Sequence, residues 1–204
     1  MKTLSKISIS ILVVSFALIG SQCLANKNAP ELPSPKAQAQ LKKAASSKDR
    51  ANLLKVAKKL LSPLEYKVAF ESGTERAFKN RYWKNKEAGI YVDIITGEAL
   101  FSSVHKFKSG TGWPSFDRPL TSNVVEVVDK SHGMKRIEVR SKTSDIHLGH
   151  VFEDGPKKTT GRRFCINSAS LRFIPLAEIK KAGYGNLLEK AELNDAFEKL
   201  GQKK

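Results

Sequence analysis

The fold class is decided by residues 124–140, which read VVEVVDKSHGMKRIEVR. Two runs rich in β-branched residues, 124–128 and 136–140, flank Lys130-Ser131-His132-Gly133, a sequence typical of a hairpin turn. Further β-prone runs lie outward of this hairpin at 90–95, 163–167 and 170–174, and the last two form either a strand pair or one bent strand. We therefore predict a mainly β fold of antiparallel strands, with helical extensions at both termini.

Helical patterns flank this β-rich centre. Residues 37–61 are rich in Ala, Lys and Leu, and their leucines follow the spacing of an amphipathic helix. The sequence SPLE at 62–65 predicts a serine N-cap and a capping box for a second helix that ends near Gly73. Segments 175–182 and 186–200 predict two more helices, the last one strongly charged.

The first 25 residues have the layout of a secretory signal peptide. Lys2 and Lys6 precede an apolar run over 7–19, and small or neutral residues then lead to Ala25. The apolar run is short for a membrane span. We therefore predict cleavage after Ala25 and a periplasmic or secreted protein, with a retained membrane anchor as the alternative.

The chain is strongly basic, with 36 Lys or Arg against 20 Asp or Glu and a net charge of +16. Segment 26–60, predicted to be a Pro- and Lys-rich linker and helix, holds nine basic and two acidic residues. No aromatic residue lies between these lysines, so the segment lacks the stacking platform that nucleic-acid binding would use. A solvated helix face and electrostatic contact with acidic surfaces both remain open.

Cysteine usage points to one residue. The chain contains only Cys23 and Cys165, and cleavage after Ala25 would leave Cys165 without an internal disulfide partner. Arg163 and Asn167 lie two residues on either side of it, so on a β-strand all three share one face. The charge of Arg163 would favour the reactive thiolate, although a buried, inert cysteine is the alternative.

Two further stretches carry unusual residue types. SGTGWPSF at 109–116 places Trp113 and Phe116 beside two glycines, where they form either a pocket wall or a core anchor. HLGHVFEDGP at 147–156 contains two histidines followed by acidic residues. Acid/base work suits histidine because its ordinary pKa lies close to neutrality, whereas metal binding would need more soft ligands nearby.

Together, three motifs closely resemble the methionine-R-sulfoxide reductases of the MsrB type: GTGWPSF at 110–116, HLGHVFEDGP at 147–156 and RFCINSASLRF at 163–173. Supporting stretches at 61–66, 73–78, 85–91 and 99–103 extend the resemblance over about residues 60–187. The resemblance implies a catalytic domain over 61–187 with two small antiparallel sheets, followed by a charged tail or helix over 188–204.

The resemblance also implies roles for the nucleophile and its pocket. Cys165 would attack the sulfoxide sulfur and become a sulfenic acid, the first reversible step of cysteine oxidation. Trp113 would line the pocket for the S-methyl group of the substrate, together with Phe116 and Phe152. An indole suits this position because it offers apolar area and favourable contacts to sulfur.

Polar residues of the motifs would assist the reaction. The resemblance makes His150 the direct proton donor to the sulfoxide oxygen, with His147 in the same cluster. Asp154 would tune or share that proton. Arg163 would stabilise the thiolate of Cys165, and Asn167 would hold a water or orient a histidine.

The sequence departs from the family pattern at the metal site. Many members bind a structural zinc through two C-x-x-C pairs, but this chain has Asp93, Thr96, Ser141 and Ser144 at the corresponding positions. All four thiolates are missing, so we predict no bound metal and no bound cofactor.

A second departure concerns turnover. Thr111 stands where members with a resolving cysteine often carry it. We therefore predict that an external thiol, from a thioredoxin-like protein or a small molecule, reduces the sulfenic acid through a mixed disulfide. The predicted function is protein repair: thiol-dependent reduction of methionine-R-sulfoxide in oxidised proteins or peptides. A binding module that uses the basic segment and a peroxide-sensing thiol are the alternatives.

Overall fold

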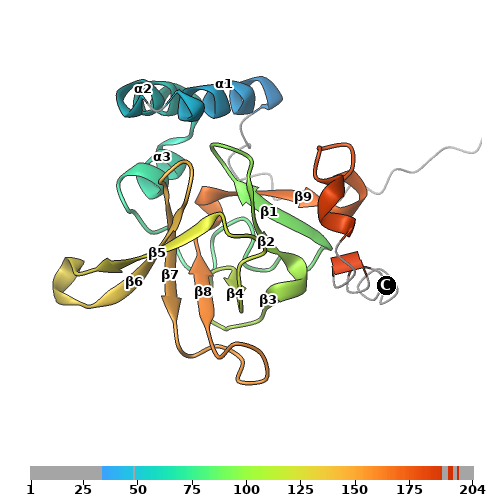
Figure 1. The fold of residues 1–204 in the computed structure, drawn as a ribbon. Coiled ribbons are helices and arrows are strands. Elements are labelled where there is room, and N and C mark those ends of the chain that lie inside the picture. Colours follow the sequence, from blue (N-terminus) through green and yellow to red (C-terminus); the bar gives the residue numbers. More distant parts are fainter. Residues whose placement is uncertain (1–33, 48, 190–192, 195–196, 198–204) are drawn as a thin grey trace, which may run out of the picture.

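A computed structural model describes residues 34–47, 49–189, 193–194 and 197. Two antiparallel sheets form its centre, and helices lie at one end of them (Figure 1). The three-stranded sheet has the order β2-β1-β9, from Ala99–Ser102, Gly89–Asp93 and Leu171–Pro175. The six-stranded sheet has the order β3-β4-β8-β7-β6-β5, from Lys106–Phe107, Ser115–Phe116, Arg163–Ile166, His147–Phe152, Arg136–Ser141 and Val124–Asp129. The predicted mainly β, antiparallel fold is confirmed.

The hairpin predicted around residues 130–133 is also confirmed. β5 and β6 pair from Val124 opposite Ser141 to Asp129 opposite Arg136, and the connection contains the short 3-10 helix η2, Ser131–Gly133. By contrast, β8 and β9 belong to different sheets, joined by the 3-10 helix η3, Ser168–Ser170. The prediction that 163–174 is a strand pair or one bent strand was therefore wrong.

The helix after Ser62 has the predicted start. α3 spans Pro63–Phe70, where the Ser62 hydroxyl accepts a hydrogen bond from the Glu65 N–H at 3.3 Å. The Glu65 carboxylate in turn accepts one from the Ser62 N–H at 2.9 Å, which completes the capping box. Local sequence alone specifies this helix start.

The helical segment predicted over 37–61 consists of two helices, α1 over Pro35–Ser46 and α2 over Arg50–Leu60. The break lies at Asp49, whose carboxylate accepts a hydrogen bond from the Asn52 N–H at 3.0 Å and caps α2. Each helix buries an apolar face in the core that also contains the strands, through Leu41 in α1 and Leu53 in α2. Over residues 34–47 and 49–60, the basic segment is thus attached to the domain, and its described lysines are exposed.

The other terminal predictions have mixed outcomes. Residues 175–182 contain only the 3-10 helix η4, Leu176–Glu178, and 3-10 helix η5 spans Gly185–Glu189. Most of the helix predicted over 186–200 and the whole predicted signal peptide lie outside the described residues. Within the described part of the chain, no helix is both long and apolar enough to span a membrane.

Aromatic side chains form the core between the two sheets. Phe101 and Phe116 stack at a centroid distance of 4.6 Å, and Tyr91 meets Phe116 edge-on at 5.1 Å. Phe116 is fully buried in this cluster. Its predicted place in the substrate pocket was wrong, because its strand turns the ring away from the face that carries Cys165.

The four positions compared with zinc ligands are all buried. Asp93 accepts hydrogen bonds from the Ile95 and Thr96 N–H groups at 2.6 and 3.1 Å, and from the Ser144 hydroxyl at 2.6 Å. The two turns that contain Asp93 and Ser144 are thus joined directly by a hydrogen bond. No group of three or more His, Cys, Asp or Glu in the described ranges is arranged to hold a metal ion.

The N-terminal helices contact these same two turns. The Gln38 side chain of α1 donates to the Ile95 carbonyl at 2.7 Å, and Arg50 of α2 donates to the Ser144 carbonyl at 2.8 Å. Packing and hydrogen bonding by α1 and α2 therefore support this end of the domain.

Candidate active site

One face of the six-stranded sheet gathers the predicted catalytic residues. Cys165 on β8 lies opposite His150 on β7 and opposite Ser115 on β4. Arg163, two residues earlier on β8, lies opposite Phe152. Directly opposite residues in an antiparallel pair share a face, so these side chains form neighbouring rows on the sheet.

His147 joins this face through an irregularity in the strand pairing. Residues three apart on a regular strand point to opposite faces. Here the register shifts, so that Val139 faces Gly149 while Arg140 faces His147. This β-bulge turns His147 to the same side as His150, and the two rings lie 5.4 Å apart.

His150 is held by a carboxylate that the sequence did not identify. Its Nε2 donates to Asp129 Oδ2 at 2.8 Å, and Arg136 donates to the same oxygen at 2.7 Å. Hydrogen bonds from Ser131, followed by the one from His150, hold the pKa of Asp129 well below its ordinary value. Because Asp129 is ionised, its bond keeps a proton on Nε2 and leaves Nδ1 of His150 as the nitrogen that gains or loses one.

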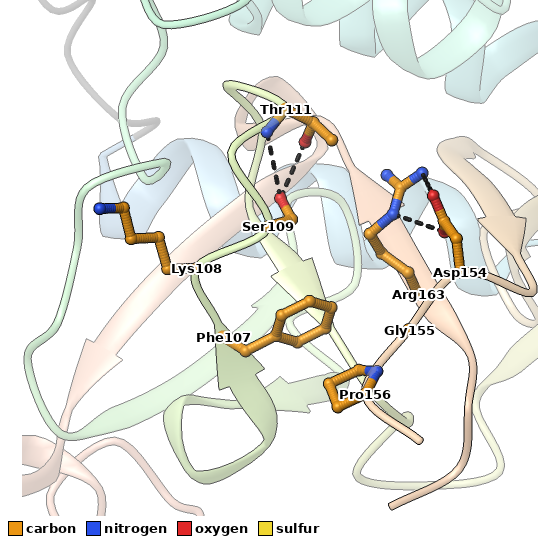
Figure 2. Close-up of a pocket in the computed structure, with 8 residues that line it drawn as sticks. All are labelled: Phe107, Lys108, Ser109, Thr111, Asp154, Gly155, Pro156 and Arg163. Atoms are coloured by element: carbon orange, nitrogen blue, oxygen red, sulfur yellow. Dashed lines mark hydrogen bonds and ion pairs between the residues drawn. The ribbon is translucent and has the colours of Figure 1, made fainter. Parts of the chain in front are cut away.

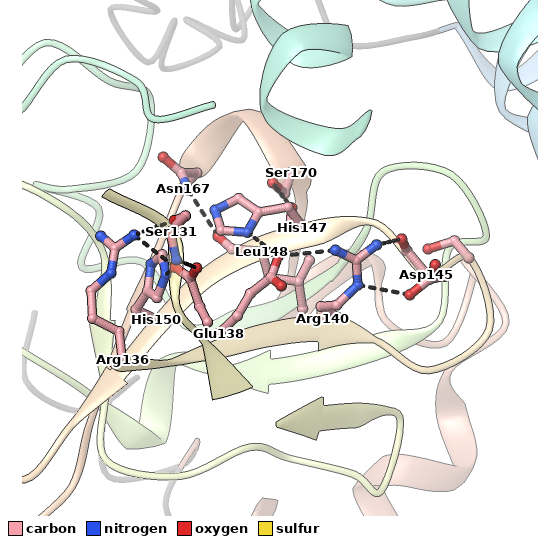
Figure 3. A network of polar contacts seen from close by, with 12 residues as sticks. Ser131, Arg136, Glu138, Arg140, Asp145, His147, Leu148, His150, Asn167 and Ser170 are labelled. Atoms are coloured by element: carbon pink, nitrogen blue, oxygen red, sulfur yellow. Dashed lines mark hydrogen bonds and ion pairs between the residues drawn. The ribbon is translucent and has the colours of Figure 1, made fainter. Parts of the chain in front are cut away.

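A carboxylate also holds His147, in the same way that Asp129 holds His150 (Figure 3). Its Nδ1 donates to Glu138 Oε1 at 2.6 Å, and Arg140 donates to the same oxygen at 3.0 Å. Burial lowers the pKa of His147, so the ring is neutral near pH 7. Its Nε2 atom is buried without a hydrogen-bond partner among the described residues. His150 therefore lines the cavity, whereas His147 does not line it and packs against the His150 ring.

Asp154 pairs with Arg163 and not with a histidine. Arg163 Nε and Nη2 each lie 2.8 Å from an oxygen of Asp154 in a two-point ion pair, and the guanidinium lies 4.5 Å from the centroid of the Phe152 ring. The hydrogen bonds from Arg163 lower the pKa of Asp154. The prediction that Asp154 tunes or shares the proton of His150 is therefore not supported, since Asp129 occupies that position.

The thiol of Cys165 is only partly exposed. Burial raises its pKa, and the charge of Arg163 acts in the opposite direction without overcoming it. The Thr111 hydroxyl lies 4.0 Å from the sulfur. The predicted influence of Arg163 on the thiol therefore has the right sign, but the resting cysteine keeps its proton at neutral pH.

A cavity of about 180 Å³ opens beside the sulfur. Its lining combines aromatic and aliphatic side chains with a few polar ones: Thr74, Trp113, Arg136, Gly149, His150, Phe152, Cys165, Ile166 and Asn167. Trp113 and Phe152 lie where the sequence placed them. The Trp113 indole N–H donates to the Glu75 carbonyl at 3.1 Å, which fixes the plane of the ring.

Asn167 uses both ends of its side chain for structure. Its Oδ1 accepts from the Glu75 N–H at 3.1 Å, and its Nδ2 donates to the Leu148 carbonyl at 3.0 Å. Its hydrogen bond to Leu148 fixes the backbone between the two histidines. The role expected for Asn167, in holding a water or orienting a histidine, stays a prediction.

Glu75 links the two walls of the cavity and was not predicted as a site residue. Its carboxylate accepts hydrogen bonds from the backbone N–H groups of Ser168 and Ala169, while its own backbone contacts Trp113 and Asn167. Burial raises the pKa of Glu75 to about 7. A buried carboxylate that joins these segments orders the cavity without facing it.

Sequence reasoning also missed Asp129, Arg136 and Glu138. The available signal was the alternation of polar and apolar residues in RIEVR, which indicates one polar face on that strand. Nothing local indicates which histidine each carboxylate reaches, because Asp129 and His150 are 21 positions apart.

Comparison with known protein families identifies the family of the β-rich part of the chain. A family model described as the SelR domain matches residues 61–175, which is more than half of the chain. The matched range contains every residue of the cavity and both carboxylate–histidine pairs.

Proposed function

Because this chain belongs to the SelR domain family, the MsrB methionine-R-sulfoxide reductases, we propose that Cys165 is its nucleophile and that an external thiol completes each turnover. The observation that carries this proposal is the position of Cys165 directly opposite His150, beside a cavity walled by Trp113 and Phe152. That arrangement supports the proposal, because the Cys165 thiol, the His150 ring and apolar surface all border one small volume.

The cavity suits a methionine sulfoxide side chain. The S-methyl group would lie against Trp113 and Phe152, where aromatic surface makes favourable contacts with a thioether or methyl group. The sulfoxide oxygen would then face His150 on the neighbouring strand. The cavity would therefore accept only one of the two sulfoxide epimers, because the methyl group and the oxygen would bind in separate, chemically different places.

His150 would supply the proton that makes the sulfoxide oxygen a leaving group. Asp129 holds Nε2 of the ring at 2.8 Å and offers a counter-charge to the imidazolium. Nδ1 is then the nitrogen that exchanges a proton with substrate. General acid catalysis by a positioned histidine contributes roughly a hundredfold to ten-thousandfold in rate.

The reaction takes up and releases no net proton. Cys165 loses its thiol proton, and its sulfur forms a transient S–S bond to the sulfoxide sulfur. The oxygen then passes to Cys165 while that S–S bond and the S–O bond of the substrate break, so that methionine leaves and Cys165 becomes a sulfenic acid. The thiol is oxidised by two electrons, and the sulfoxide is reduced by two. Because burial raises the pKa of Cys165, the proton that reaches the sulfoxide oxygen can come from the thiol itself through His150.

We propose oxidised proteins or peptides as substrates, and repair of oxidised methionine as the biological role. The basic N-terminal helices offer electrostatic contact with acidic surfaces.

Residues 1–25 are proposed to direct export and then to be removed after Ala25. The N-terminal sequence of the protein recovered from the cell envelope or medium checks this, and a chain that still starts at Met1 contradicts it.

Stereospecific turnover tests the activity. Peptides with methionine-R-sulfoxide or methionine-S-sulfoxide are incubated with the protein and a thiol, and methionine is quantified by chromatography. We expect product from the R epimer alone and none with Cys165→Ser. Equal turnover of both epimers, or turnover by Cys165→Ser, would contradict the proposal. Mass spectrometry without thiol should show one added oxygen on Cys165.

A further inference from the structure

A second cavity, of about 310 Å³, lies where the connection between β3 and β4 meets the segment after β7 (Figure 2). Its lining comes from the β3–β4 connection, the segment after β7 and the start of β8: Phe107, Lys108, Ser109, Thr111, Asp154, Gly155, Pro156 and Arg163. It shares no lining residue with the cavity beside Trp113.

The second cavity approaches the sulfur from the β4 side. Cys165 has His150 opposite it on β7 and Ser115 opposite it on β4, so these neighbours flank it in opposite directions. Ser109, which lines the second cavity, bonds to Ser115 at 2.7 Å and to Thr111 at 2.9 Å. Thr111 in turn lies 4.0 Å from the sulfur of Cys165. Thr111 therefore forms the contact between the cavity and the sulfur.

The chemistry of turnover needs access from this side. In the sulfenic acid proposed above, the oxygen on Cys165 faces His150, where the sulfoxide oxygen was bound. A thiolate displaces that oxygen in line, so it must reach the sulfur from the side opposite the S–O bond. Of the two cavities, the one lined by Thr111 lies next to the sulfur on that side, with Thr111 between the cavity and Cys165.

The charged side chains that line the cavity indicate what kind of ligand it favours. Lys108 is exposed and contributes a full positive charge, whereas the charge of Arg163 is largely neutralised by its two-point pair with Asp154. The Ser109 and Thr111 hydroxyls add hydrogen-bonding groups. The lining thus carries two cations against one anion and favours a negatively charged ligand.

We propose that this cavity binds the reductant, and that the reductant is a small thiol that carries a carboxylate, with Lys108 contacting that carboxylate. The inference rests on the proposed sulfenic acid at Cys165. A volume of about 310 Å³ is at the lower end of the range for small-molecule sites, which favours a small thiol over a protein thiol.

The steps balance with two thiols. The first thiolate forms an S–S bond to Cys165 while the S–O bond breaks, and the oxygen takes up protons and leaves as water. A second thiolate attacks the sulfur of the bound reductant, forms a small-molecule disulfide and releases Cys165 as a thiol. The two thiols lose two electrons in total, and Cys165 gains them.

The test separates reduction of Cys165 from its oxidation. The protein is first mixed with a methionine-R-sulfoxide peptide in the absence of thiol, and the methionine formed per chain is counted. The sulfenic form is then reduced at low salt with 3-mercaptopropionate or with neutral 2-mercaptoethanol, and the rates are compared at equal thiolate concentration. Lys108→Ala is compared with Lys55→Ala, which removes the same charge from an exposed position on α2.

We expect the carboxylate thiol to react faster than the neutral one. Lys108→Ala should reduce this preference by about fivefold, as expected for the loss of one charge contact at a partly exposed site. Lys55→Ala should keep the preference. Equal rates for both thiols, an unchanged preference in Lys108→Ala, or reduction only by a thioredoxin-like protein would overturn the inference.

Two other outcomes are distinguishable. If Lys108→Ala raises the KM for the sulfoxide peptide and leaves the thiol preference intact, the cavity belongs to the substrate and the inference is wrong. If no methionine forms in the thiol-free mixture, the proposed function itself fails, and the inference fails with it.

Discussion

Nε2 of His150 lies 2.8 Å from Oδ2 of Asp129, which is 21 positions away and at the end of the edge strand β5. The same carboxylate oxygen accepts from Arg136 at 2.7 Å. Asp129 on β5 thus accepts hydrogen bonds from Arg136 on β6 and from His150 on β7. His150 in turn lies directly opposite Cys165 on β8. This relationship determines the tautomer of the His150 ring and supplies a counter-charge for its protonated form.

Asp129→Asn tests the importance of that pair. The asparagine keeps the shape of the side chain but removes the negative charge that stabilises the imidazolium of His150. We expect kcat/KM for the methionine-R-sulfoxide peptide to fall by roughly tenfold to a hundredfold, which is less than the loss of a whole general acid would cost, because the His150 ring itself remains. Steady-state kinetics measures the effect.

Glu126→Gln is the matched control, because Glu126 lies on the same strand and pairs with Arg162 on the surface. It should keep near-normal activity. If both variants lose activity equally, the effect belongs to the stability of β5, and the Asp129–His150 contact has no catalytic role.

Removing the charge of Arg163 or of Asp154 should shift the pKa of the Cys165 thiol in opposite directions. Burial raises the pKa of the Cys165 thiol, and the charge of Arg163 lowers it while that of Asp154 raises it. Arg163→Gln should therefore move the pKa further up, and Asp154→Asn should move it down. The pH dependence of alkylation by iodoacetamide measures both, and shifts in the same direction would contradict the assignment.

Glu75 predicts a pH dependence of stability. Its pKa is raised from 4.5 to about 7 in the folded protein. Between these values the unfolded chain ionises Glu75 while the folded protein keeps it protonated, so the free energy of unfolding falls as pH rises. The loss is about 3 kcal/mol, complete near pH 7 and absent below about pH 4.5.

Urea unfolding of the protein and of Glu75→Gln, measured from pH 4 to pH 8, isolates this contribution. The difference in the free energy of unfolding between the two proteins should change over that window, because glutamine does not titrate. A constant difference would show that Glu75 ionises normally in the fold.

Thr111→Cys should create an internal resolving cysteine. The Thr111 hydroxyl lies 4.0 Å from the sulfur of Cys165, so a thiol at that position comes close enough to attack a sulfenic acid with little movement. Without added thiol, one turnover should leave a disulfide between the two residues, detectable by mass spectrometry. Ser109→Cys is the comparison, since the Ser109 hydroxyl bonds to Thr111 and Ser115; equal disulfide yields would contradict the geometry.

Asp93 is predicted to stabilise the end of the domain beneath α1 and α2. It is fully buried and accepts hydrogen bonds from Ile95, Thr96 and Ser144. Asp93→Ala leaves these donors unpaired, and we expect a loss of about 3 kcal/mol in the free energy of unfolding. Asp93→Asn, which keeps an acceptor for the two backbone N–H groups, should lose less, and urea titration distinguishes the two. A larger loss for Asp93→Asn would be inconsistent with this network.

Local sequence predicted those parts of the fold that depend on neighbouring residues. The capping box at Ser62 and Glu65 and the hairpin between β5 and β6 are satisfied within a few residues of chain, so their patterns are visible in one dimension. Cys165, His150 and Trp113 were also singled out this way, because they lie in short, chemically distinctive stretches, and the structure brings all three to one cavity.

Sequence reasoning did less well where strands change direction or sheet. Phe116 was expected in the pocket, but pairing of β4 with β8 turns it into the core against Phe101. The separation of β8 and β9 into different sheets was likewise not visible in the β-prone runs at 163–174.

The sequence by itself therefore determined the mainly β class, the capping box at the start of α3 and the candidate residues of the cavity. Only the tertiary structure decided that Asp129 pairs with His150 and Asp154 with Arg163, that a bulge brings His147 beside His150, and that Thr111 contacts Cys165. The physical reason is that caps and turns are closed by bonds between near neighbours. The register between strands is set by packing over the whole sheet, and a shift of one residue moves a side chain to the opposite face.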